Sequence, residues 1–155
     1  MPKDDTSAPD ASQDNIASQM ASIIYRLDQI LRDTILRRLD LTYIHFRVLQ
    51  YLYATDGRQI GEIAAAIAVR QPVLSRVIDQ MQERALVRRE PDPQDNRRMR
   101  VYLTDHGRSR YQEAWPPAHD LLETALKGFK AREREAMRRL LHKMTTNLLD
   151  RYEPR

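Results

Sequence analysis

The residues best suited to a chemical role lie in the stretch EPDPQDNRRMRVYLT, which spans positions 90 to 104. Prolines and carboxylates precede three arginines, which are Arg97, Arg98 and Arg100. The planar guanidinium of arginine donates paired hydrogen bonds that fit phosphate oxygens and the edge of guanine. Arginines held on a stiffened loop therefore indicate recognition of phosphates or base edges.

Catalytic or metal chemistry finds little support elsewhere in the 155 residues. The chain has no cysteine, so thiolate metal sites, disulfides and thiol redox sensing are excluded. No glycine-rich phosphate loop or nucleophile motif occurs, and the four histidines stand far apart, at positions 45, 106, 119 and 142. We therefore expect a protein that is not an enzyme and that holds no metal or cofactor.

Positive charge is concentrated around the arginine-rich stretch. The net charge is +4, and residues 70–110 alone hold ten arginines against six acids. Residues 1–69 hold seven basic and nine acidic side chains, and residues 111–155 hold nine and seven. An excess of this size is also typical of a solubilising surface, so charge alone does not assign a function.

The remainder of the chain must position these arginines, and its scarcity of glycine (four residues) favours helices. Residues 1–14 are polar and lack periodicity, which is typical of a disordered tail. No apolar run approaches the roughly 20 residues that cross a bilayer, and the acidic N-terminus is unlike a signal peptide. We expect one domain over residues 15–155, cytoplasmic and without contact to membranes.

Two helices are predicted first. Apolar residues at helical spacing from Ile16 to Leu39 predict one continuous helix, longer than a small core needs, which suggests burial against a second chain. Thr42 is the predicted N-cap of the next helix, with His45 where a capping box would place Glu or Gln.

Residues 60–84 have the pattern of a helix-turn-helix. A short helix over 60–68 and a tight turn precede a helix over 71–84, with Pro72 in its first turn. The expected buried side consists of Ile63, Ile67, Val69, Val73, Val77, Ile78 and Met81. Base and phosphate contacts are expected from the N-terminal end of the second helix. Helical hairpins that bind no DNA share this spacing, so the helix pair leaves both functions open.

A β-hairpin follows directly. Residues 86–90 and 98–104 alternate with period two on either side of a turn-rich loop of seven residues. Helix-turn-helix plus hairpin predicts a mainly α fold with a small β-hairpin wing, in which residues 41–104 form a winged-helix core. The tip of such a wing reaches the phosphate backbone or the minor groove, where negative potential favours arginine.

These residues resemble the MarR (multiple antibiotic resistance regulator) family. The wing sequence DPQDNRRMRVYLTDHG matches the family pattern D-P-x-D-x-R, followed by L-T-x-x-G, and the segments LTYIHFRVLQYL and VLSRVIDQMQERALVRR resemble its helices. The resemblance covers about residues 16–152. It implies a homodimeric regulator of double-stranded DNA, usually a repressor that a small phenolic or aromatic-acid ligand releases from a pseudo-palindromic operator.

The resemblance also assigns roles within the wing. Arg97 would enter the minor groove and Asp95 would orient its guanidinium, while Asp92 and Pro93 shape the turn. Arg98 and Arg100 are expected to contact the phosphate backbone of the DNA or to be solvated. The predicted DNA contacts are Arg70, Gln71, Pro72, Val73, Ser75, Arg76, Asp95, Asn96, Arg97 and Arg98.

The chain departs from the family pattern at three positions. Ala85 replaces a glycine at the end of the recognition helix, and a left-handed alanine there would cost on the order of 1 kcal/mol. We therefore expect the turn to adjust. His45 stands where glutamine is common, and Ala131 stands where a serine or threonine cap is common.

The C-terminal half is predicted to be helical. Thr104 caps a helix that Pro116 and Pro117 should kink or restart near residues 113–115, and a last helix covers 132–152. Residues 15–40 and 105–155 are the expected dimerisation helices. A dimer would place two recognition helices in successive major grooves, about 34 Å apart.

An effector cleft is expected between the dimer helices and the winged-helix core. The family position of such pockets implies aromatic walls and a cationic end, suited to an aromatic carboxylate. The candidate lining residues are Tyr25, Arg26, Tyr43, His45, Trp115 and His119. Each also has an ordinary role open to it: His45 at a helix start, Trp115 in the core, Arg26 in solvent.

The sequence therefore predicts a DNA-binding transcriptional regulator, a homodimeric repressor released by a small ligand. An activator or a DNA-binding protein without effector fits the same residues. A winged-helix protein-interaction module is the alternative from another class, but its wing would not need three arginines.

Overall fold

The structure is a computed structural model that describes residues 15–152. Its backbone contacts group into two compact units, residues 15–118 and 119–152 of the described chain, which are treated separately below. The predicted disordered tail, residues 1–14, lies outside the described residues. In chain order the elements are α1 (Ile16–Leu31), the π-helical turn η1 (Arg32–Leu36), α2 (Tyr43–Ala54), β1 (Arg58–Gln59), α3 (Ile60–Ile67), α4 (Gln71–Glu83), β2 (Val87–Pro91), β3 (Met99–Leu103), α5 (Asp105–Ala125) and α6 (Ala131–Tyr152).

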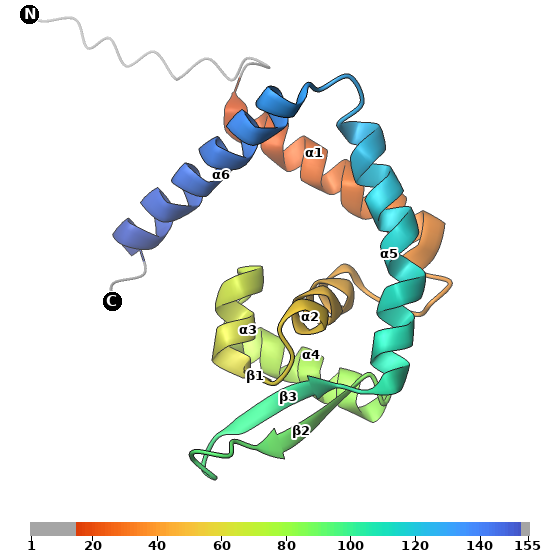
Figure 1. The fold of residues 1–155 in the computed structure, drawn as a ribbon, viewed down its shortest axis with the longest axis vertical. Coiled ribbons are helices and arrows are strands. Elements are labelled where there is room, and N and C mark those ends of the chain that lie inside the picture. Colours follow the sequence, from red (N-terminus) through yellow and green to blue (C-terminus); the bar gives the residue numbers. More distant parts are fainter. Residues whose placement is uncertain (1–14, 153–155) are drawn as a thin grey trace, which may run out of the picture. The chain divides into compact units, whose positions relative to one another are not determined.

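The first unit contains the predicted helix-turn-helix and wing. Helix α3 packs on α2 and α4, and the hairpin of β2 and β3 extends beside α4 (Figure 1). Side chains from every one of these elements meet in one core, including Leu49, Ile63, Leu74, Ile78 and Val101, each fully buried. The fold class predicted from the sequence is confirmed.

The wing is part of a three-stranded antiparallel sheet, not of an isolated hairpin. The strand order is β1-β3-β2, with Arg58 opposite Val101 and Val87 opposite Leu103. Strand β1 has two residues, too few to show a period, so the sequence does not predict it. It anchors the wing at the N-terminus of α3.

The first predicted helix is interrupted. Helix α1 ends at Leu31 and a π-helical turn follows, in which Arg37 N donates to Arg32 O at 3.1 Å. The Thr34 hydroxyl donates to the carbonyl of Ile30 at 2.8 Å, and side-chain bonds of this kind compete with the helix and open its turns. The prediction of one continuous helix from 16 to 39 is therefore wrong at this turn.

Three helical segments end in the same way. Asp40, Ala68 and Ala85 all have positive φ, at 54°, 56° and 53°. At the end of α4, Leu86 N donates to Met81 O and Ala85 N to Gln82 O, which is the Schellman pattern. The expectation that the turn would adjust around Ala85 is wrong, because this pattern requires a left-handed residue.

Helix α5 runs without a break through both of its prolines. Pro116 and Pro117 lie inside the helix, so the predicted restart does not occur. Each proline removes one backbone donor, but its fixed φ is compatible with continued helix. In the second unit, Lys130 N donates to Glu133 at 2.7 Å at the start of α6, which supplies the cap that Ala131 cannot. No helix among the described residues is long and apolar enough to cross a membrane.

Candidate nucleic-acid interface

The recognition helix α4 is anchored on one face and open on the other. Leu74, Ile78 and Met81 are all 0% exposed and fix the buried stripe. Of the predicted contacts, Arg70, Gln71, Pro72, Val73 and Arg76 are exposed and Ser75 is half-buried. Val73 is 46% exposed, so its prediction as a core residue is wrong, and its side chain lies on the open face with the other predicted DNA contacts. Leu74 occupies the core position, because its spacing from Ile78 and Met81 defines the stripe.

Ion pairing within the chain divides the arginines of residues 70–110 into two sets. Seven of the ten form ion pairs: Arg84, Arg88, Arg89, Arg98, Arg100, Arg108 and Arg110. Arg70, Arg76 and Arg97 are exposed and form no ion pair with any residue that the structure describes. These three lie at the start of the recognition helix, along it, and at the wing tip.

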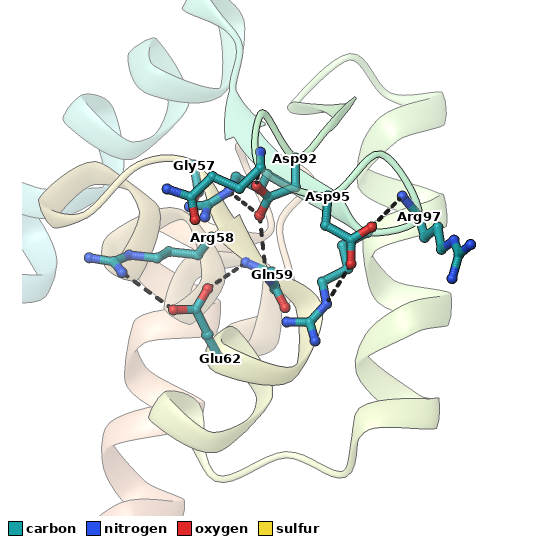
Figure 2. A network of polar contacts seen from close by, with 10 residues as sticks. Gly57, Arg58, Gln59, Glu62, Asp92, Asp95 and Arg97 are labelled. Atoms are coloured by element: carbon teal, nitrogen blue, oxygen red, sulfur yellow. Dashed lines mark hydrogen bonds and ion pairs between the residues drawn. The ribbon is translucent and has the colours of Figure 1, made fainter.

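The wing tip holds Arg97 through its backbone. Asp95 Oδ1 accepts from the backbone N of Arg97 at 3.0 Å, and its other oxygen lies 3.4 Å from Nε of Arg98. Figure 2 shows the Arg97 side chain pointing away from this cluster. The predicted ion pair between Asp95 and the Arg97 guanidinium is therefore absent here, because Arg98 occupies the carboxylate. Asn96 is exposed beside them.

Asp92 is the centre of the wing base. It is 2% exposed and accepts hydrogen bonds from Gln94 N at 2.9 Å, Arg100 Nε at 2.6 Å and Gln59 Nε2 at 3.3 Å (Figure 2). The bond from Gln94, followed by those from Arg100 and Gln59, lowers the pKa of Asp92 against the opposing effect of burial. The predicted role in shaping the turn is incomplete, since Asp92 also ties the wing to β1.

Arg100 is a structural residue. Its Nε pairs with Asp92, and its Nη1 donates to the carbonyl of Gly57 at 2.8 Å. The bonds with Asp92 raise the pKa of Arg100, which stays cationic. The expectation of a solvated side chain is wrong for Arg100, because its Nε and Nη1 are both bound within the chain. Its period-two position beside Val101 gives no signal of a partner 43 residues away.

A second pair joins the wing to the recognition helix. Arg89 of β2 lies 2.6 Å from Asp79 of α4 and donates to the carbonyl of Ser75 at 3.5 Å. The sequence analysis did not assign either member of the Asp79–Arg89 pair. A single sequence carries no signal for it, because the geometry depends on how β2 packs on α4.

The predicted effector residues are only partly brought together. Tyr25 and Tyr43 line an open groove of about 800 Å³ between α1 and the start of α2. Arg26 is exposed and is not among the lining residues, and Trp115 lies beside Tyr111 in a tilted arrangement with ring centroids 5.9 Å apart. His119 belongs to the second unit.

The groove is also lined by charged side chains that were not among the predicted effector residues. Arg32 and Arg37 line it, and they are paired with Asp28 at 2.6 Å and Asp33 at 2.9 Å. An anionic occupant would have to compete with these carboxylates.

His45 serves the helix start. It is 5% exposed, its backbone N donates to Thr42 Oγ1 and its Nδ1 accepts from Thr42 N, both at 3.2 Å. The ring thus completes the capping box that the sequence left open. Burial, followed by the charge of Arg84, lowers the pKa of His45.

A helix-turn-helix with an exposed, arginine-bearing face is followed by a braced hairpin, whose tip arginine has no ion-pair partner among residues 15–152. This arrangement defines the class of winged-helix DNA-binding proteins. Known proteins agree with this class. A family model described as the MarR family matches residues 39–98. A MarR-family transcriptional regulator from Silicibacter pomeroyi is 36% identical, with a TM-score of 0.77, 85% of this chain covered and 88% of that one.

Two further solved structures share the fold and carry information about ligands. The MepR–DNA complex of S. aureus is 25% identical, with a TM-score of 0.79 and coverages of 86% and 96%. BpsR of Bordetella bronchiseptica, whose DNA binding is regulated by 6-hydroxynicotinic acid, is 28% identical, with a TM-score of 0.76 and coverages of 85% and 94%. The present chain belongs to the MarR family of DNA-binding transcriptional regulators.

Proposed function

We propose that this MarR-family regulator is a cytoplasmic homodimeric repressor that a small aromatic acid releases from a pseudo-palindromic operator. The observation that carries the DNA-binding surface is the set of unpaired arginines. Because Arg70, Arg76 and Arg97 have no carboxylate partner within the described chain, phosphates can bind them without displacing one. Arg97 enters the minor groove, and the N-terminal half of α4 enters the major groove.

Salt dependence tests this surface. A duplex selected by the protein from a random-sequence DNA pool serves as operator, and binding is followed by fluorescence anisotropy. Arg70→Ala and Arg76→Ala should each lower the slope of log affinity against log salt by about 0.9, the contribution of one phosphate. Arg110→Ala is the matched control, since Arg110 is paired with Glu113. Slopes that are unchanged in both variants would refute these contacts.

The proposed dimer rests on apolar side chains that each unit leaves exposed. In the first unit, Ile16, Ile23, Ile24 and Ile30 of α1 are between 45% and 67% exposed. In the second unit, no residue of α6 whose burial is described is buried. The exposed apolar side chains of α6 are Met137, Leu140, Leu141, Met144, Leu148 and Leu149. Stripes of this length are typical of helices that bury against a second chain.

Deletion of residues 132–155 tests the dimer. The truncated chain should be monomeric by analytical ultracentrifugation and should bind the selected duplex weakly, because only one recognition helix engages at a time. A control with Leu140→Ala alone should remain dimeric at high concentration. A truncated chain that is dimeric and binds tightly would contradict the proposal.

The proposed ligand is an aromatic acid in the groove beside Tyr25 and Tyr43. The aromatic rings suit a planar ligand, and Arg32 and Arg37 supply cations. Salicylate and 6-hydroxynicotinic acid are suitable probes. Binding should raise Tm by mass action and release the selected duplex, and Tyr43→Ala should remove both effects. The absence of any Tm shift across a panel of aromatic acids would contradict ligand release by this class.

A further inference from the structure

Three segments of the first unit meet at the side chain of Arg84, the C-cap residue of the recognition helix. Its Nη2 donates to the backbone carbonyl of Asp40 and lies 2.9 Å from the Asp40 carboxylate. Its Nη1 lies 3.4 Å from Nδ1 of His45, near the start of α2. Arg84 therefore links the end of α4 to the turn after η1 and to the cap of α2.

The ring of His45 must be unprotonated at Nδ1 for this arrangement. That nitrogen faces two donors, the backbone N–H of Thr42 at 3.2 Å and the guanidinium of Arg84. A proton on Nδ1 would remove the only lone pair that faces them. The ring also lies in the first turn of α2, where a positive charge is disfavoured by the helix dipole.

Two charged groups face the ring from neighbouring segments. Arg84, from the end of α4, disfavours the imidazolium, and Asp40, from the turn before α2, favours it. The Asp40 side chain is 91% exposed and so weakly opposes burial and Arg84. Burial is the largest influence, and the pKa of His45 is lowered from 6.5.

The contacts of Arg84 lie at the point where the recognition helix ends and the wing begins. Arg84 is followed by Ala85 in its left-handed conformation, then by Leu86, which is 1% exposed, and then by β2. A rotation of α4 about its end would therefore displace both elements that contact DNA. We propose that His45 and Arg84 are positioning residues for DNA binding: unprotonated His45 and Asp40 hold Arg84, and Arg84 fixes the end of the recognition helix.

DNA binding should weaken as the pH falls and His45 is protonated. Above pH 6.5 the ring is neutral in the folded and the unfolded chain, and the link is complete. As pH falls below 6.5, the unfolded chain binds a proton first, so His45 lowers the stability of the fold. Protonation in the folded state repels Arg84 and leaves Thr42 N without its acceptor. If DNA binding requires the intact link, affinity falls over the same window.

The test compares wild type with His45→Gln, since glutamine retains a capping-box acceptor but does not titrate. Affinity for the selected duplex is measured by anisotropy between about pH 7.5 and pH 5.5, the range in which histidines titrate. Wild-type Kd should rise a few-fold more than that of His45→Gln, since a lowering of the His45 pKa by about one on DNA binding gives a tenfold ratio only well below both pKa values. His106→Gln, on an exposed histidine, should keep the wild-type profile.

Arg84→Met tests the role of Arg84, because methionine keeps an apolar stem but has no hydrogen-bond donors. It should weaken binding at neutral pH and remove most of the pH dependence that distinguishes wild type from His45→Gln. A merely structural role for His45 would change Tm but leave identical pH profiles of Kd in wild type and His45→Gln. That result would overturn the inference.

The inference deepens the DNA-binding role, and its failure can be told apart from failure of the proposed function. If selection yields no duplex, the proposed operator binding fails. Amide hydrogen exchange without DNA then decides the inference. At about pH 5.5, residues 81–86 should be less protected in wild type than in His45→Gln, each relative to its intrinsic rate. Equal protection in the two proteins would overturn it.

Discussion

The tip and the base of the wing contain the same residue types and use them in opposite ways. At the tip, Asp95 and Arg98 form an exposed pair at 3.4 Å, and Arg97 has no partner among the described side chains. At the base, Asp92 is 2% exposed and pairs with Arg100 at 2.6 Å. Both regions thus pair an arginine with a carboxylate, three residues apart at the tip and eight at the base, and burial of the carboxylate distinguishes the two.

The comparison shows how a small domain can keep an arginine available for DNA without pairing it with one of its own carboxylates. Buried Asp92 fixes the loop, and the backbone bond from Arg97 N to Asp95 at 3.0 Å fixes the turn at the tip. Because the loop is ordered before DNA arrives, less conformational entropy is lost on binding. The Arg97 guanidinium remains free to bind phosphate or the minor groove.

The largest expected effect comes from removing the centre of the base. Asp92→Ala leaves Arg100, Gln59 and the N–H of Gln94 without their shared acceptor, so the wing loses its side-chain link to Gln59 of β1. Affinity for the selected duplex should fall by about tenfold or more, with a clear loss of Tm. Anisotropy and circular dichroism melts measure the two quantities. Unchanged Tm would show that the base is not a structural unit.

Strong acid should weaken the base of the wing by protonating Asp92. The folded-state pKa of Asp92 is lowered from 3.8, so its contribution to stability is present above that pH and is lost as pH falls below it. Melts between about pH 5 and pH 2.5 should show a steeper loss in wild type than in Asp92→Asn. Parallel curves for the two proteins would contradict the assignment of Asp92.

The turn between α4 and β2 contains a strained residue whose replacement should stabilise the fold. Ala85→Gly relieves a left-handed alanine at φ 53° and should raise the free energy of unfolding by about 1 kcal/mol. DNA affinity should change little, because Arg97 is untouched. Ala65→Gly, inside α3, is the matched control and should lower stability by about 1 kcal/mol. A destabilising Ala85→Gly would contradict the observed turn.

The smallest effect is expected at the exposed pair of the tip. Arg98 and Asp95 are 62% and 46% exposed in their side chains, and pairs of this kind contribute about 0–1 kcal/mol. Arg98→Ala should leave Tm within about 2 °C of wild type and weaken DNA binding only a few-fold. If Arg98→Ala lost as much DNA affinity as Arg97→Ala, Arg97 would not be the more important of the two arginines for DNA binding.

Local patterns predicted most of the fold. The spacing of Ile78 and Met81, the N-cap Thr42 and the alternation around Val101 all depend on neighbours in sequence. Strand β1, the π-helical turn and the left-handed Ala85 were missed. Each of these is decided by packing or by hydrogen bonds that compete with the local propensity.

For the candidate site, the sequence predicted which residues are exposed better than it predicted their contacts within the chain. Arg97 and the start of α4 are exposed as the resemblance implied, whereas the partners of Asp92 and Arg100 were not foreseen. Gln59 lies 33 residues before Asp92, and Gly57 lies 43 residues before Arg100. A single sequence does not reveal such pairs, because only the fold brings them together.

The most direct test of the contrast compares Arg97→Ala with Arg100→Ala in the same two assays. Arg97→Ala should keep the wild-type Tm and lose about tenfold in affinity for the selected duplex, the effect of one good arginine contact. Arg100→Ala should lower Tm together with affinity, because it breaks the bonds to Asp92 and Gly57. An Arg97→Ala protein that binds like wild type, or an Arg100→Ala protein with unchanged Tm, would contradict the division between tip and base.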